Sequence, residues 1–223
     1  MIVDVIIILS LLLGGVIGFK KGAIKTGISF VSLVIAFILA AMFKDNVSNF
    51  LYGVCPFFNF SGQFEGLTSL NILMYEVIAF FTILSLLMIA VNIIKFVTGV
   101  VEKVLKATII LAIPSKIIGF FVGFIEAGIY VFVILYFLSL PMFNIKLISE
   151  SKITKPYLEY TPFLSGVTKK PMEAVEEVYD LTAKKDNMTN KEINQKSLDI
   201  LIKYKVISQD KADELIKKDK LKM

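Results

Sequence analysis

Glu126 is the residue with the clearest chemical potential, because it is the one charged residue in the apolar stretch from Ile117 to Leu140. Inserting a carboxylate into hydrocarbon costs about 2.5 kcal/mol or more, so such a group normally faces a charged partner or a water-filled cavity that carries ions or protons. The stretch has 24 residues, and Glu126 lies near its middle. What binds Glu126 is therefore the central question that the sequence raises.

Three other polar residues lie near the ends of apolar stretches and are candidates for the same chemistry. They are Lys25, Glu76 and Asn92. One hypothesis is that the long stem of Lys25 extends inward to reach Glu126. The alternative is that Lys25 snorkels to the membrane surface, and that Glu126 is protonated and bonded to a serine or a backbone carbonyl. For Glu76 and Asn92 we expect positions at the membrane interface.

The composition argues against most enzyme designs. The chain has 24 lysines but no arginine, histidine or tryptophan, so histidine acid–base chemistry, histidine metal ligands and arginine clamps are absent. Cys55 has no second thiol with which to form an intramolecular disulfide or to share a metal ion. The lysines are scattered, without the aromatic pattern of a nucleic-acid site. We therefore expect no catalytic, metal or cofactor site and no nucleic-acid partner.

The composition also predicts the class of fold. Apolar residues make up 56% of the chain and its mean hydropathy is +0.76, values typical of a membrane protein. A helix crosses a bilayer with about 17 to 25 mostly apolar residues. We predict an all-α integral membrane protein whose transmembrane helices form two hairpins, with spans at residues 2–18, 22–43, 72–94 and 117–140.

The distribution of lysines predicts the orientation of the spans. Lysines gather in the turn at residues 19–26 and in the segment 95–116, where the spacing of apolar residues predicts an amphipathic surface helix over about 96–110. By the positive-inside rule both connections are cytoplasmic and both chain ends are outside. We place the aromatic-rich loop 44–71 outside, at the level of the lipid headgroups.

The composition changes at Pro141, and no later apolar stretch is long enough to cross a membrane. We predict a linker at residues 141–170 and a separate soluble tail at 171–223. The tail is expected to be helical, and its first helix is expected to begin at Pro171, since proline suits the first helical position.

Short motifs predict further helices in this tail. Thr189 with Glu192 forms a capping-box pattern, and Ser208 is suited to cap a last helix. The segment Leu198–Lys218 resembles the C-terminal helical hairpins of the SHOCT type, which implies oligomerisation or docking. A plain charged helical tail is the alternative.

Small residues at four-residue spacing predict close packing between helices. Gly119, Gly123 and Ala127 lie on one face of the fourth span, where they would let a second helix backbone approach. The complete set of predicted packing residues is Gly14, Gly18, Gly22, Gly27, Gly119, Gly123, Ala127 and Gly128.

Part of this pattern is repeated along the chain. Residues 17–28 and 118–129 are identical at seven of twelve positions, which is either chance or a parallel repeat with a twofold axis along the membrane normal. A repeat would place the second and fourth spans together through their glycine faces, with Lys25 opposite Glu126.

Two short motifs resemble the CvpA family, named for colicin V production. An acidic residue near the start followed by a basic-Gly-apolar-x-basic turn is one, and a basic residue with glycines three and seven positions later is the other. The matching residues are Asp4, Lys21, Gly22 and Lys25 for the first motif and Lys116, Gly119 and Gly123 for the second. Thr26 and Glu126 depart from residues that the family often has.

This resemblance covers about residues 1–140, and it implies a fold and a location but no reaction. It implies a four-span protein of the bacterial cytoplasmic (inner) membrane with a role in bacteriocin or toxin production or in envelope physiology.

Three classes of function remain. We expect a non-enzymatic scaffold or assembly factor whose partners are membrane lipid and either further copies of itself or other envelope proteins bound through the tail. The alternative is a small channel or transporter with Glu126 in a polar path, which would need to oligomerise because four spans enclose little space. An enzyme acting within the bilayer would lack a nucleophile–base pair and metal ligands.

Overall fold

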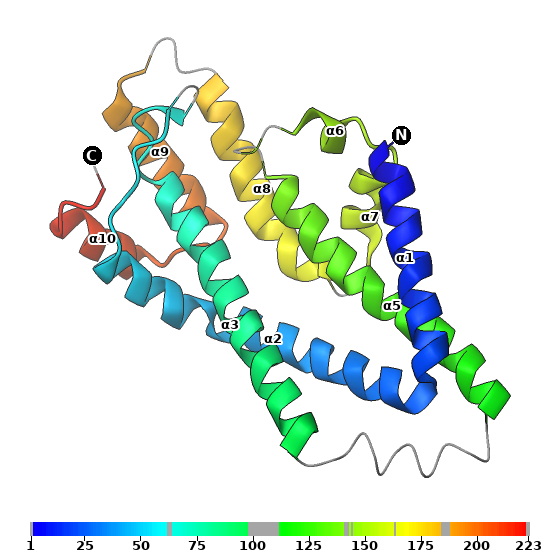
Figure 1. Cartoon of the computed structure of the whole chain (residues 1–223). Helices are drawn as coiled ribbons and strands as arrows, with labels where there is room; N and C mark the ends of the chain where they lie inside the picture. The colour runs from blue at the N-terminus through cyan, green and yellow to red at the C-terminus, as the bar shows by residue number, and fades with distance from the viewer. Residues whose placement is uncertain are drawn as a thin grey trace.

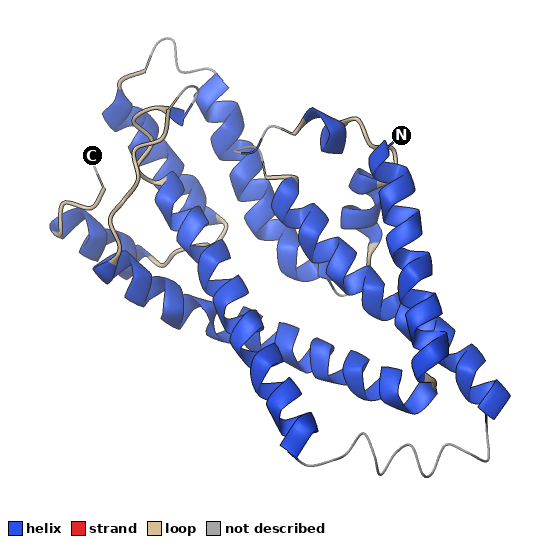
Figure 2. Ribbon diagram, viewed as in Figure 1, coloured by secondary structure: helices blue, strands red, loops and turns tan. Residues whose placement is uncertain are grey.

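The computed structural model describes residues 2–61, 64–97, 112–140, 143, 145–162, 164–183 and 188–221 of the 223-residue chain. Every secondary-structure element in these residues is a helix (Figures 1 and 2). Long helices form a membrane domain, and the helices that follow them in sequence gather at one end of that domain.

Four helices are long and apolar enough to cross a membrane. They are α1 (Ile2–Lys21), α2 (Ala23–Val54), α3 (Leu70–Val97) and α5 (Ala112–Leu138). This confirms the predicted all-α fold with four spans. The ends of these helices that carry Lys21, Lys95 and Lys116 point the same way, and we call this end the lysine side (Figure 1). The opposite end is the tail side.

The packing order of the spans differs from two hairpins. The most extensive contact of α1 is with α5 and not with α2, while α2 contacts both α5 and α3. The contacts therefore follow the order α1, α5, α2 and α3. Figure 1 shows α1 beside α5, with α2 running obliquely to both and crossing α3.

The glycines of α1, rather than those of α2, form the close contact with α5. A methyl group added at Gly18 would lie 2.1 Å from the carbonyl oxygen of Gly119, and one added at Gly123 would lie 2.4 Å from the carbonyl oxygen of Gly14. The prediction that the second and fourth spans pack through their glycines is therefore wrong. Gly27 of α2 has open space where its side chain would be. The two helices run in opposite directions, so equal four-residue spacings stay in register along both.

A tight turn separates α1 from α2. Gly22 has a φ of 80°, a conformation that favours glycine because a Cβ would clash with the backbone. The backbone N–H of Ala23 donates to Ser115 Oγ at 3.1 Å, which ties the turn to the first helical turns of α5. Pro114 lies in the first turn of α5 and does not interrupt the helix. A proline is tolerated there because the backbone N–H groups of the first turn have no hydrogen-bond acceptor within the helix.

The helices α2 and α3 are longer than predicted. Residues 44–54, expected to be loop, continue α2 for about 16 Å at 1.5 Å per residue. The helix ends at Val54 because Cys55 precedes Pro56, and a residue before proline avoids the helical conformation. α3 continues to Val97, whereas the rest of the surface helix predicted for 96–110 lies outside the described residues.

The predicted linker is folded and returns toward the membrane domain. It contains α6 (Lys146–Ser149), α7 (Thr154–Tyr160) and the beginning of α8 (Leu164–Ala183). α8 thus begins before Pro171, which lies inside it. α7 runs back along α5 and α8 returns to the tail side, as Figure 1 shows in yellow-green and yellow.

The depth of this hairpin follows from the contacts at its turn. Tyr157 Oη donates to the backbone oxygen of Gly128 at 2.9 Å, and Leu164 packs in a cluster with Leu33 and Phe132. Leu33 lies about 15 Å along α2 from its lysine-side end. The α7–α8 hairpin therefore packs among the spans and returns to the side from which it came, and we call it the re-entrant hairpin.

The tail shares a core with the membrane domain. The helices α9 (Asn190–Lys203) and α10 (Gln209–Lys217) pack through Leu198, Leu201 and Leu215 in one apolar cluster with Tyr52 of α2 and Ile72 of α3. The structure therefore departs from a separate tail beginning at residue 171. The predicted caps are confirmed: Thr189 and Glu192 form a capping box, and Ser208 Oγ accepts from the N–H of Lys211.

Candidate functional site

α2 carries polar residues near both ends and apolar residues between them. In order from the lysine side they are Ser29, Leu33, Phe37, Lys44, Ser48 and Tyr52, which are four or seven residues apart. Because a step of four residues turns slightly more than one full helical turn, this stripe winds around α2, from the side that meets α5 at Ser29 to the side that meets α3 at Ser48 and Tyr52. The stripe therefore leads from one polar site to another, and we call these sites the Glu126–Ser29 pair and the Glu76 cluster.

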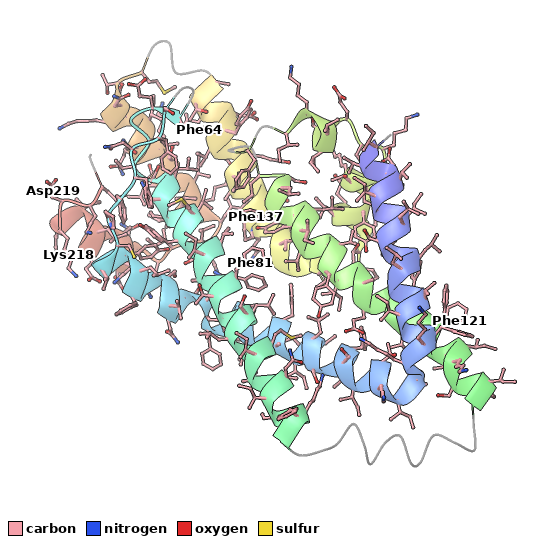
Figure 3. All side chains as sticks on the ribbon, in the orientation of Figure 1. Phe64, Phe81, Phe121, Phe137, Lys218 and Asp219 are labelled. Carbon is pink, nitrogen blue, oxygen red and sulfur yellow. The ribbon has the colours of Figure 1, made fainter. Side chains whose placement is uncertain are left out.

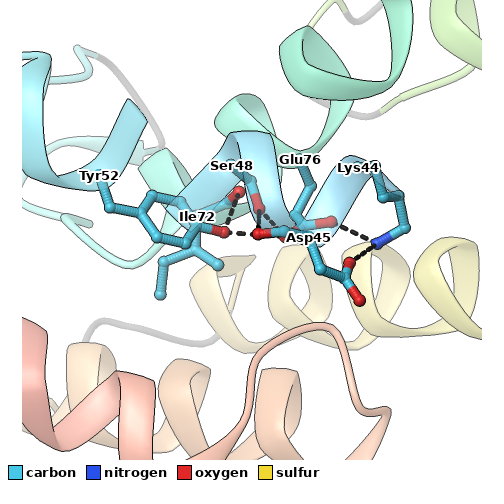
Figure 4. A network of polar contacts seen from close by, with 6 residues as sticks. All are labelled: Lys44, Asp45, Ser48, Tyr52, Ile72 and Glu76. Atoms are coloured by element: carbon cyan, nitrogen blue, oxygen red, sulfur yellow. Dashed lines mark hydrogen bonds and ion pairs between the residues drawn. The ribbon is translucent and has the colours of Figure 1, made fainter. Parts of the chain in front are cut away.

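The Glu76 cluster joins α2 to α3 near the tail side (Figure 4). Glu76 is 8% exposed and forms an ion pair with Lys44. Its Oε1 atom accepts hydrogen bonds from Ser48 Oγ at 2.7 Å and Tyr52 Oη at 3.0 Å. Asp45 lies 2.7 Å from the Lys44 ammonium on its other side. The glutamate thus has one cation and two hydroxyl donors, which is the kind of pairing that a buried carboxylate requires.

Glu76 is visible in the sequence as a charge in an apolar stretch, but its partners are not. Residues 44–54 were expected to form a loop, and a loop offers no fixed spacing to bring Lys44, Ser48 and Tyr52 together. The signal that could have found them is their four-residue spacing, which continues the helical period of the apolar face before them. Glu76 is accordingly a buried group rather than an interfacial one.

A cavity of about 300 Å³ adjoins the Glu76 cluster. It lies between α2, α3 and α5 and is covered by α8 and by the segment after α9. Charged and hydroxyl groups in its lining include Lys44, Asp45, Glu76, Tyr136 and Lys170. This arrangement places a cavity with several charged and hydroxyl groups beside the Glu76 cluster.

The Glu126–Ser29 pair joins α5 to α2 nearer the lysine side. Ser29 Oγ donates to Glu126 Oε1 at 2.6 Å, and Glu126 is half-buried about midway along α5. A serine is the partner in the second of the two hypotheses above. Lys25 is half-buried one turn before Ser29, and no ion pair joins it to Glu126 among the described residues. Lys95 of α3 lies within electrostatic range of Glu126 instead.

An apolar plug separates the two polar sites. We use this name for the buried cluster of Leu33 and Phe37 from α2, Ile129, Phe132 and Val133 from α5, and Leu164 from the re-entrant hairpin. Phe37 also meets Phe80 of α3 edge to face, with ring centroids 5.2 Å apart. Figure 3 shows Phe81 of α3 and Phe137 of α5 facing each other on the tail side of this plug, at 5.5 Å.

The remaining predicted residues have structural contacts. Asp4 Oδ1 accepts hydrogen bonds from Ser151 Oγ at 2.7 Å and from the N–H of Ile153 at 3.1 Å, so it fixes the segment before α7. The Lys116 ammonium lies over the Phe19 ring at 5.9 Å. Asn92 and Lys21 are exposed, and Gly128 lies against Tyr157.

Burial raises the pKa of the Tyr157 hydroxyl. A phenol with a raised pKa keeps its proton, and this proton is the one that Tyr157 donates to the Gly128 carbonyl. The hydrogen bond that holds the re-entrant hairpin therefore persists throughout the physiological range of pH.

These features define a polytopic α-helical membrane protein with a re-entrant hairpin and two intramembrane polar sites. The chain belongs to the family described as Colicin V production protein, whose pattern it matches over residues 3–162. The match extends beyond the fourth span and includes α6 and α7.

One relative is similar to this chain over most of its own length. The chain is 29% identical over 170 residues to an uncharacterized transmembrane protein, YshB, of Bacillus subtilis strain 168. The alignment covers 74% of this chain and 93% of the relative. No solved structure matches.

Proposed function

We propose that the protein is a non-enzymatic membrane conduit for protons or small ions, with Glu126 in its path and the apolar plug as its gate. The observation that carries the proposal is the position of Glu126. It is half-buried about midway along α5, it bonds a neutral serine of α2 rather than a lysine, and the stripe along α2 leads from that serine to the Glu76 cluster. Ionisable groups at this depth commonly mark ion or proton pathways, and apolar constrictions gate by excluding water.

The re-entrant hairpin supports the same function. Irregular backbone at membrane depth is tolerated only where protein buries it or where it lines a hydrated cavity. Here Leu164, the first residue of α8, contributes to the plug, and α8 covers the cavity beside Glu76. A movement of the hairpin along α5 would open the plug and join the two polar sites.

The conduit requires more than one copy of the chain. One side of α3 carries the exposed residues Ile78, Leu86, Ile89 and Ile93. Four spans do not enclose a path by themselves, and a second copy packed against this side of α3 would extend the bundle.

The direct test is a flux assay in proteoliposomes, with a pH gradient and separately with a potassium gradient. The intact protein is expected to dissipate one of them, and Glu126→Gln is expected to reduce that flux at least tenfold, whereas Asp199→Asn on the exposed face of α9 is a matched control that leaves it unchanged. Absence of flux in the intact protein under both gradients contradicts the conduit.

A scaffold that assembles envelope or bacteriocin-production proteins is the second candidate. It is favoured by the rigid attachment of α9 to the membrane domain, because a partner bound to the tail would be held in a fixed orientation. Site-specific cross-linking from exposed residues of 171–223 that recovers one defined protein, together with no flux, favours the scaffold over the conduit.

For the location, we propose the bacterial cytoplasmic membrane with the lysine side in the cytoplasm and both chain ends outside. The Asp4–Ser151 hydrogen bond supports placing the N-terminus and the tail on the same side. Labelling of Cys55 in intact cells by a membrane-impermeant thiol reagent tests this, since Cys55 is partly exposed on the tail side. If Cys55 reacts only after the cells are broken, the tail side is cytoplasmic and the proposed orientation is wrong.

A further inference from the structure

A second, larger cavity opens on the other side of α5. It has a volume of about 850 Å³ and lies between α1 and α2, with α5 as its back wall and α7, which contributes residues along its length, as a further wall. Leu11, Phe30, Phe124, Ile125 and Tyr157 are among the side chains that line it. The α1–α2 turn at Gly22 closes it toward the lysine side, where these two helices converge (Figure 1).

The depth of this cavity determines what can fill it. Leu11 lies at the middle of α1, and Phe124 lies near the middle of α5, so the walls are at the level of the hydrocarbon. The lining is almost entirely apolar, and Lys152 is the one charged side chain in it. An aqueous ligand would gain little here, whereas a lipid acyl chain matches both the depth and the chemistry of the walls.

The shape argues against a protein helix as the occupant. A helix with its side chains is about 10 to 12 Å wide and would have to continue past both ends of the cavity. The convergence of α1 and α2 at their turn closes the lysine-side end, so a helix could not continue past it. A single chain of methylenes needs no such continuation.

Lys152 supplies a charged end for the cavity. It lies in the turn before α7 at the tail side, it is exposed, and Lys155 lies one helical turn further, with its side chain 84% exposed. The turn is held in place, because Asp4 accepts hydrogen bonds from Ser151 and Ile153 on both sides of Lys152. A cation fixed at the mouth of an apolar cavity complements a phosphate joined to an acyl chain.

We propose that this cavity binds an anionic phospholipid of the tail-side leaflet, with one acyl chain between α1 and α2 and its phosphate at Lys152. Binding would support α7 from below, because Tyr157 and Ile153 form part of the cavity wall.

The natural chain contains no tryptophan, which allows a site-specific test. Phe124→Trp places a fluorophore in the cavity wall, and Leu86→Trp places a control fluorophore on the exposed face of α3, where residue 86 is 61% exposed. Each variant is reconstituted in phosphatidylcholine vesicles with increasing fractions of either phosphatidylglycerol or phosphatidylcholine that carries brominated acyl chains, which quench tryptophan on contact.

For Phe124→Trp we expect the brominated anionic lipid to bind about fivefold more tightly than the zwitterionic one, given about 1 kcal/mol per lysine near a membrane surface. Leu86→Trp should show no preference. Adding Lys152→Glu to Phe124→Trp should remove the preference, whereas adding Lys191→Glu, at an exposed position of α9, should leave it intact.

Equal quenching by both lipids at Phe124→Trp overturns the proposal, and so does a preference that survives Lys152→Glu. If Phe124→Trp fails to fold, Phe30→Trp on the opposite wall provides the same reading. Weak quenching by both lipids at each of these positions, compared with strong quenching at Leu86→Trp, would show that no chain enters the cavity.

Discussion

At the scale of single residues, Glu76 shows how this protein accommodates a charge inside an apolar domain. Its carboxylate has three partners on successive turns of α2, and together they replace the hydrogen bonds that the carboxylate would make with water. Removing one member of such a group leaves the others buried without a partner. The free-energy cost of this is larger than the net stabilisation that a buried ion pair provides.

We expect Glu76→Leu to lower the free energy of unfolding by about 2–3 kcal/mol, because Lys44 and the Tyr52 hydroxyl then lose their acceptor. This value lies below the range for a fully buried pair, since the Lys44 side chain is 25% exposed. Reversible unfolding in mixed detergent measures it. Glu76→Gln, which keeps an acceptor for Tyr52, should lose less.

A double variant provides the control for this prediction. Lys44→Met with Glu76→Leu replaces both charges by apolar groups, so its loss should be smaller than the sum of the two single losses. Strict additivity would mean that the two side chains do not interact, contrary to the geometry in Figure 4.

Glu126 itself could be predicted from the sequence, but its partner could not. The sequence identified it as the central group because a charge in an apolar stretch is visible without any structure. Its partner was not identifiable, since Lys25 and Ser29 are one turn apart on α2 and the choice between them depends on how α2 is rotated against α5. That rotation is set by packing of Leu33 and Phe37, and no local pattern encodes it.

At the scale of helices, the close contact between α1 and α5 depends on the absence of side chains. We expect Gly123→Ala to destabilise the protein by about 2–3 kcal/mol, because the added methyl would meet the backbone of α1, which cannot move aside as a side chain could. Gly27→Ala is the matched control, since that methyl would enter open space and alanine favours helix.

Thermal unfolding of both variants in the same detergent checks this prediction. Equal destabilisation by the two substitutions would mean that helix propensity, and not the α1–α5 contact, decides the cost. The sequence predicted which residues of α5 form a close contact but assigned the wrong partner helix. The repeat suggested a parallel pairing, whereas an antiparallel pair of helices satisfies the same spacing of glycines equally well.

The re-entrant hairpin makes a prediction about depth. With Cys55 replaced by serine, single nitroxide labels at Lys155, Thr161, Ser165 and Lys169 should report a depth that increases from Lys155 to Thr161 and decreases again to Lys169. The collision rates of each label with oxygen and with a water-soluble nickel complex measure that depth. A uniform aqueous signal at all four positions would place α7 and the start of α8 outside the membrane.

This hairpin could not be predicted from the sequence, for a physical reason. α7 has seven residues and α6, which precedes the hairpin, has four, too few to show a helical period. Pro156 and Pro162 resemble loop signals. Burial of such a segment depends on a groove already formed by α2 and α5. A segment that folds only against such a groove carries little local information about its structure.

At the scale of the whole molecule, the tail and the spans form one cooperative unit. Asn194 of α9 is 1% exposed and joins them: its Oδ1 atom accepts from the N–H of Thr68 at 2.8 Å, and its Nδ2 atom donates to the oxygen of Gly66 at 2.8 Å. Behind it, Leu201 is fully buried in the cluster that includes Tyr52 and Ile72. Composition could not predict this contact, because a charged amphipathic helix has the same sequence pattern whether it packs on the rest of its own chain or binds another protein.

The predicted consequence is that damage to α9 spreads into the membrane domain. Asn194→Leu should cost about 2 kcal/mol, because it leaves the Thr68 N–H and the Gly66 carbonyl unsatisfied in a buried site. Hydrogen exchange followed by mass spectrometry should then accelerate both in α9 and in residues 64–76, the segment that begins α3. Gln195→Leu, on the exposed face of the same helix, should accelerate neither. Faster exchange confined to α9 would mean that the tail unfolds independently, and a tail with that freedom could not hold α8 over the cavity beside Glu76 or keep the re-entrant hairpin in place.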